Sequence, residues 1–139
     1  MSGIPTIDQE KLDGLRAELG VHFPRILSYF AEDGVKSVEA IEQAVRARDA
    51  VALVRPAHTL KGEALQFGAE ALGLAAEHLE KGARDAVEGH SFPLDAVEYS
   101  ATLRSLFADA LAALRQAAAP VAAPTPLRRP VTGFGRKVG

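Results

Sequence analysis

Apolar residues recur every three or four positions through the first 119 residues, and short stretches with glycine or proline interrupt them. This spacing places apolar side chains on one face of a helix, whereas a half-buried strand alternates every second residue. The pattern predicts helical segments at about 8–19, 23–33, 36–48, 50–67, 69–87 and 94–118, with no clear strand. The abundance of alanine and leucine agrees, because these residues lose little side-chain freedom in a helix.

The connections between these segments are short, so consecutive helices are expected to lie antiparallel in an up-and-down bundle. Asp49 is a suitable N-cap for the segment 50–67, and Gly68 is expected to end that segment. Pro56 lies inside the same segment, where it removes one backbone hydrogen bond and crowds the preceding turn. We expect a kink there rather than the start of a new helix.

The composition changes near Pro120. Residues 120–139 contain four prolines and three glycines, which cannot sustain a helix. This segment also carries basic residues and no acidic residue: Arg128, Arg129, Arg136 and Lys137. The sequence therefore predicts a helical domain over 1–119, followed by a flexible basic tail over 120–139.

Several classes of protein do not fit this sequence. It has no cysteine, which excludes disulfide scaffolds and thiolate metal sites. No apolar run is long enough to span a membrane, and the first residues do not resemble a signal peptide. A net charge of −2 does not suggest binding to nucleic acid. No glycine-rich phosphate loop is present, so we expect no kinase activity of its own.

One helical stripe in the segment 50–67 carries groups that suit phosphoryl chemistry: His58, Lys61, Gly62 and Leu65. The neighbouring stripe is entirely apolar and is expected to face the core: Ala57, Leu60, Ala64 and Phe67. A neutral imidazole is a nucleophile near pH 7, and Lys61 offers a cation to the phosphoryl oxygens. Gly62 leaves no side chain beside the ring, so a bulky partner could approach it.

The returning helix must bring a further group level with His58. If the chain turns at Gly68, positions 78–80 lie opposite 57–58, and His78 and Glu80 point about 200° apart. Geometry alone does not choose between these two side chains. Glu63 lies 140° from His58 around the helix, and we expect it to face solvent.

The run Ala57-His58-Thr59-Leu60-Lys61-Gly62 resembles the signature of histidine phosphotransfer (HPt) domains, in which the histidine is phosphorylated. The resemblance continues in register through Gly68-Ala69, Leu72 and Leu79-Glu80. It implies an all-α fold, namely an antiparallel four-helix bundle with an additional N-terminal helix. It also implies a cytoplasmic phosphocarrier of two-component phosphorelays, which exchanges phosphoryl groups with receiver-domain aspartates or takes them from a kinase.

The resemblance assigns roles to four residues. His58 is the expected phosphoacceptor through Nε2, Lys61 stabilises the phosphoryl group, Gly62 gives access, and Glu80 reaches back to the histidine. The expected partners are response-regulator receiver domains and a hybrid sensor histidine kinase. We expect a monomer with no cofactor, and we expect Mg²⁺ to bind to the receiver partner because no carboxylate trio surrounds His58.

Three other interpretations stay open at this point. The chain could be a metal-binding bundle that uses His58, His78 or Glu80, although it lacks the Glu-x-x-His pairs of di-metal bundles. It could be a docking module without phosphorylation, or the phosphoacceptor domain of a larger histidine kinase. His22, His78 and His90 are expected to have no catalytic role. Phe67 is expected in the core, and Leu65 in a docking surface beside His58.

Overall fold

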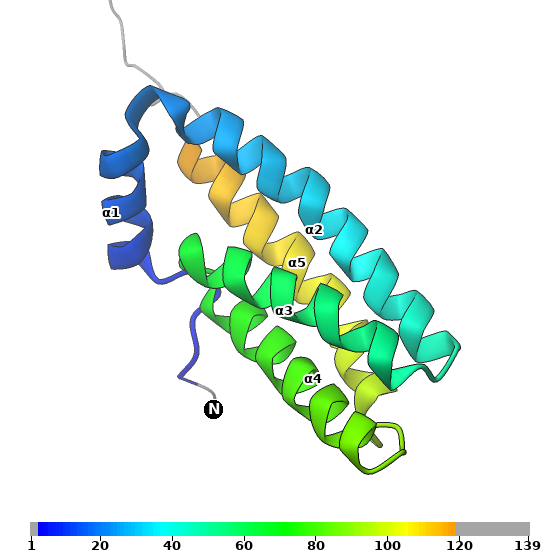
Figure 1. Ribbon diagram of the computed structural model, residues 1–139. Coiled ribbons are helices and arrows are strands. Elements are labelled where there is room, and N and C mark those ends of the chain that lie inside the picture. The colour runs from blue at the N-terminus through cyan, green and yellow to red at the C-terminus, as the bar shows by residue number, and fades with distance from the viewer. Residues whose placement is uncertain (1–2, 119–139) are drawn as a thin grey trace, which may run out of the picture.

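The computed structural model describes residues 3–118, which form an all-helical fold without strands (Figure 1). The elements are α1 (Gln9–Leu19), a short 3-10 helix η1 (Gly20–His22), α2 (Phe23–Arg46), α3 (Ala50–Gln66), α4 (Glu70–Glu88) and α5 (Ala96–Ala118). Helices α2 to α5 pack as an antiparallel four-helix bundle in which α2 contacts α3 and α5, and α4 contacts the same two helices. The predicted fold class is confirmed, whereas the predicted tail over 120–139 lies outside the described residues.

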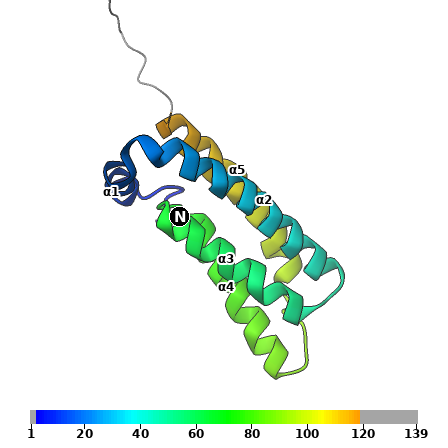
Figure 2. The same cartoon turned by 45° about the horizontal axis from the view of Figure 1, so that its top comes forward.

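Helix α1 is the additional N-terminal helix. It lies at one end of the bundle, inclined to the four long helices (Figures 1 and 2). Asp8 caps it by accepting hydrogen bonds from the backbone N–H groups of Glu10 and Lys11. The backbone N–H of Asp8 donates to the carbonyl of Gly68, over 2.6 Å, so α1 is attached to the turn between α3 and α4.

Gly68 forms the turn that makes α3 and α4 a hairpin. Its φ of 79° is in the left-handed region, and a Cβ atom there would lie 2.9 Å from the carbonyl oxygen of Asp8. Asp49 caps the other end of α3 by accepting from the N–H of Ala52, as predicted. These two positions fix where α3 begins and ends, and they bring α4 back alongside it.

The predicted division into segments 23–33 and 36–48 is wrong, because α2 continues without interruption from Phe23 to Arg46. Gly34 lies where α2 meets α5, and a Cβ atom on it would be 2.2 Å from Cε1 of Phe107. This glycine therefore allows close packing and does not end a helix. Pro56 likewise lies within a continuous α3, so no new helix starts there, and the kink expected at Pro56 stays a prediction.

The apolar stripe of α3 is the core face, as predicted. Ala57, Leu60 and Ala64 are fully buried, and Phe67 is almost fully buried. Phe67 contacts the rings of Phe23 and Phe30, with ring centroids 6.1 and 4.9 Å away. This packing sets the rotation of α3 and turns the neighbouring stripe, with His58, outward. None of the helices in residues 3–118 is long and apolar enough to cross a membrane.

Glu63 does not face solvent, which corrects the prediction made from its helical angle. Its side chain is half-buried, and Oε1 has no hydrogen-bond partner among the described residues. Burial raises the pKa of this carboxyl to about 7, and the nearby Asp33 of α2 adds to the effect by its charge and by a hydrogen bond. The angle from His58 was correct, but α2 occupies the space on that side of α3.

Replacing Glu63 by glutamine is expected to stabilise the fold at alkaline pH. The carboxyl keeps its proton up to about pH 7 when folded but loses it near 4.5 when unfolded, so stability falls as the pH rises between these values. The free energy of unfolding of Glu63→Gln should exceed that of the wild type by on the order of 1 kcal/mol at pH 8 and match it below about pH 4.5. Urea unfolding at both pH values measures the difference.

Glu42→Gln is the matched control. Hydrogen bonds from Arg104 outweigh burial and lower the pKa of Glu42, so this substitution should reduce stability at pH 8. A Glu63→Gln effect that is the same at pH 4.5 and pH 8 would contradict the account of Glu63.

Candidate functional site

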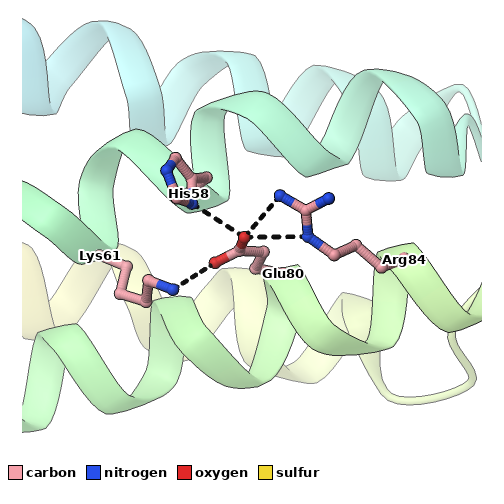
Figure 3. Close-up of polar contacts among 4 residues, drawn as sticks. All are labelled: His58, Lys61, Glu80 and Arg84. Atoms are coloured by element: carbon pink, nitrogen blue, oxygen red, sulfur yellow. Dashed lines mark hydrogen bonds and ion pairs between the residues drawn. The ribbon is translucent and has the colours of Figure 1, made fainter.

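His58 and Glu80 face each other across the hairpin of α3 and α4. Nδ1 of His58 lies 2.9 Å from Oε2 of Glu80, a hydrogen bond that joins the two helices (Figure 3). The exposed fraction differs sharply between the partners: 60% of the His58 side chain is exposed, against 7% for Glu80. The ring is therefore held at its base by a buried group while its outer edge remains in solvent.

Glu80 is a buried carboxylate surrounded by nitrogen donors. Lys61 Nζ lies 2.8 Å from Oε1, and Arg84 donates to Oε2 from both Nε and Nη2, over 3.0 and 2.8 Å (Figure 3). Burial alone would raise the pKa of Glu80. The ion pair with Lys61 and the hydrogen bonds from Arg84 and His58 outweigh burial and lower the pKa to about 2. Glu80 is therefore ionised at neutral pH.

The ionised state of Glu80 determines which nitrogen of His58 carries the proton. A carboxylate only accepts hydrogen bonds, so the contact requires a hydrogen on Nδ1 of the imidazole. In the neutral ring Nε2 then holds the free lone pair. Because the ring is exposed, this lone pair is accessible to an incoming electrophile.

Lys61 and Gly62 lie one turn further along α3. The Lys61 side chain is 25% exposed, and its ammonium has three N–H groups, which leaves it able to bind a further anion beside the ring. Gly62 is exposed, and a Cβ atom on it would have no atom within 4 Å. Packing inside the chain therefore gives no reason for glycine at this position.

Arg84, which lies one turn beyond Glu80 on α4, also belongs to the site and was not predicted from the sequence. Its guanidinium holds the carboxylate with two N–H groups, and both reach the oxygen that His58 also contacts. The four-residue spacing from Glu80 was a usable signal, since glutamate followed by arginine four positions later forms pairs on helices. On an exposed face such a pair needs no functional explanation, and its importance depends on the burial of Glu80.

His78 lies away from this cluster. Its Nε2 is 2.7 Å from Oδ2 of Asp95, and its ring stacks on Tyr99 of α5 with the centroids 4.0 Å apart. The geometric choice between His78 and Glu80 as the neighbour of His58 thus falls on Glu80. Leu65 is half-buried and packs against Gly73 of α4, where a Cβ atom would lie 2.4 Å from Cδ2 of Leu65. Leu65 thus lies between two helices, and its predicted place in a docking surface stays a prediction.

The interpretation as a metal-binding bundle finds no support in this geometry. Residues 3–118 contain no group of three or more histidine, cysteine, aspartate or glutamate side chains arranged to hold a metal ion. The charges opposite Glu80 come from Lys61 and Arg84, which already neutralise its carboxylate.

Comparison with known proteins identifies the family. The sequence model of the Hpt domain matches residues 25–117. The chain belongs to the Hpt domain family. Among solved structures it is similar to the histidine-containing phosphotransfer protein B (HptB) from Pseudomonas aeruginosa PAO1, with 26% sequence identity and a TM-score of 0.73. The similarity covers 84% of this chain and 96% of that one. The comparison with curated proteins found no match.

Membership of the Hpt family makes the chain a histidine phosphotransfer protein of phosphorelays. Hpt proteins are phosphocarriers and not kinases, and their partners are the receiver domains of response regulators. The prediction of the family is confirmed, and the matched residues include all of the site around His58.

Proposed function

We propose that His58 is the phosphoacceptor and that it reacts through Nε2. The observation that carries this proposal is the contact between Nδ1 and the ionised, buried Glu80, because it leaves the Nε2 lone pair exposed to solvent. In the proposed step the lone pair attacks the phosphorus of an aspartyl phosphate on a receiver domain. The N–P bond forms, the P–O bond to the aspartate breaks, and the bonding electrons stay on the aspartate carboxylate.

The other site residues support this step without reacting. Lys61 is proposed to bind phosphoryl oxygens with the N–H groups that Glu80 does not occupy. Gly62 is proposed to leave room for the receiver, which must bring its aspartate in line with the phosphorus and Nε2. Glu80 positions the ring, and Arg84 positions Glu80. In this proposal the only proton that matters for the reaction is the one on Nδ1 of His58.

We also propose how the chain is used. A hybrid sensor histidine kinase supplies the phosphoryl group through a receiver domain, and the chain works as a cytoplasmic monomer without a cofactor of its own. The site is compatible with a monomer, since His58, Lys61, Glu80 and Arg84 all come from one chain. Any Mg²⁺ needed for transfer is proposed to bind to the receiver partner, whose reaction supplies and removes the phosphoryl group.

A phosphotransfer assay tests the proposal. The chain is mixed with a receiver domain carrying radiolabelled aspartyl phosphate, and the label on each protein is followed over time. The proposal predicts label on this chain that is lost in acid and retained in alkali, as is typical of phosphohistidine, and that returns to unlabelled receiver. Label stable in acid, or label that cannot be passed back, would contradict a phosphocarrier role.

A further inference from the structure

His58 and Arg84 bind the same oxygen of Glu80. Nδ1 of His58 lies 2.9 Å from Oε2, and the Arg84 guanidinium reaches Oε2 with two nitrogens over 2.8 and 3.0 Å. The other oxygen faces Lys61 (Figure 3). Only 7% of the Glu80 side chain is exposed, so water can compete little with these three residues for hydrogen bonds to the carboxylate.

This geometry has a consequence for the phosphorylated ring. Once Nε2 is bonded to phosphorus, the ring is neutral only if Nδ1 gives up its proton. The lone pair left on Nδ1 would then point at a carboxylate oxygen from a distance suited to a hydrogen bond, with no hydrogen between them. Two lone pairs repel each other at this contact with a buried carboxylate, whereas a protonated Nδ1 keeps a charge-assisted hydrogen bond.

We propose that Glu80 keeps the proton on Nδ1 after Nε2 is phosphorylated, so that phospho-His58 persists as a cationic ring at neutral pH. This inference rests on the proposed phosphorylation of His58. When the phosphoryl group leaves, the N–P bond breaks and its electrons return to Nε2. The ring departs as a neutral imidazole that still carries its Nδ1 proton, and not as a poor anionic leaving group. Transfer in either direction then requires no proton to enter or leave the site.

Arg84 acts in the opposite sense, as a positioning residue. Its two N–H groups donate to the same Glu80 oxygen that accepts the hydrogen bond from Nδ1 of His58. They therefore weaken the hydrogen bond between Glu80 and the Nδ1 proton. Lys61 does the same more remotely, from the other oxygen. Lys61 of α3 and Arg84 of α4 are the cations that contact Glu80 directly. The hollow beside them is also lined by Glu77, Lys81 and Asp85 of α4, whose charges nearly cancel around the site.

The pH profile of phosphohistidine hydrolysis tests the inference without a partner protein. The intact chain is phosphorylated with potassium phosphoramidate, and loss of the His58 phosphoryl signal is followed by ³¹P NMR from pH 5 to pH 10. Hydrolysis is fast while Nδ1 is protonated and slows once the proton is lost. Glu80→Gln, which keeps the shape but removes the charge, should lower the midpoint of the profile by about one pH unit or more. Above the wild-type midpoint this corresponds to about tenfold slower hydrolysis.

Arg84→Met should raise the midpoint, and Arg84→Lys should bring it back toward that of the wild type. Glu42→Gln and Arg104→Met are matched controls, because Glu42 and Arg104 form a similar bidentate pair between α2 and α5. Both controls should leave the profile unchanged.

The inference is overturned if His58 is labelled but the profiles of the wild type and Glu80→Gln coincide. It is also overturned if Glu80→Gln and Arg84→Met move the midpoint in the same direction, since that is the result of general disturbance of the site. Label that appears elsewhere and not on His58 would overturn the proposed function, and with it this inference.

Discussion

Replacing His58 by glutamine is expected to reduce receiver-dependent phosphorylation of the chain to background. The glutamine amide has no nucleophilic nitrogen lone pair, so no N–P bond can form. The fold should tolerate the change, because the His58 side chain is 60% exposed and Glu80 keeps its contacts with Lys61 and Arg84. The stability of His58→Gln should therefore lie within about 1 kcal/mol of the wild type.

The matched control is His78→Gln. His78 is also partly exposed and also bound to a carboxylate, that of Asp95, but it lies outside the cluster around Glu80. The His78→Gln variant should be labelled at the wild-type rate. Transfer from a phosphorylated receiver, measured for both variants beside the wild type, decides between the two histidines. Label retained by His58→Gln and lost by His78→Gln would move the phosphoacceptor to His78.

Replacing Gly62 by leucine is expected to separate folding from transfer. The helix should gain stability, since glycine costs about 1 kcal/mol in a helix interior and a new side chain at this exposed position would meet no atom within 4 Å of its Cβ. Transfer from a receiver should fall by about 100-fold, because displacing the partner by even 1 Å disrupts the in-line geometry. Phosphorylation by the small donor phosphoramidate should change little.

Gly14→Leu is the control for Gly62→Leu. Gly14 is likewise exposed within a helix, α1, and also has no atom within 4 Å of a Cβ position. The Gly14→Leu variant should gain similar stability and should accept phosphoryl groups from the receiver at the wild-type rate. Equal loss of transfer from the receiver and from phosphoramidate in Gly62→Leu would show that Gly62 acts on the reactivity of His58 and not on access.

The sequence predicted those parts of the fold that depend on local pattern. The 3.6-residue period of apolar side chains placed the core face of α3 correctly, and the cap at Asp49 and the turn at Gly68 bounded that helix. The turn at Gly68 then predicted that residues 78–80 lie opposite His58. The resemblance to HPt domains then selected Glu80, and the structure brings this residue to Nδ1 of His58.

The errors have a common physical origin in contacts between segments distant in sequence. The segments 23–33 and 36–48 were predicted as separate helices, because the sequence does not show that Gly34 lies against Phe107 within one continuous helix. Glu63 looked exposed, because its angle on α3 does not reveal that α2 covers it. Arg84 passed unnoticed, since a surface pair with Glu80 gains importance only when Glu80 is buried. A helical wheel contains none of this information.

The central claim is that Nε2 of His58 carries the phosphoryl group while Nδ1 stays protonated and hydrogen-bonded to Glu80. Long-range ¹H–¹⁵N NMR of the ¹⁵N-labelled chain, recorded before and after treatment with phosphoramidate and combined with ³¹P spectra, observes both nitrogens of this ring. We predict that Nε2 acquires coupling to phosphorus and that Nδ1 remains protonated at pH 7. A phosphoryl group on Nδ1 of His58, or on a histidine other than His58, would contradict the account.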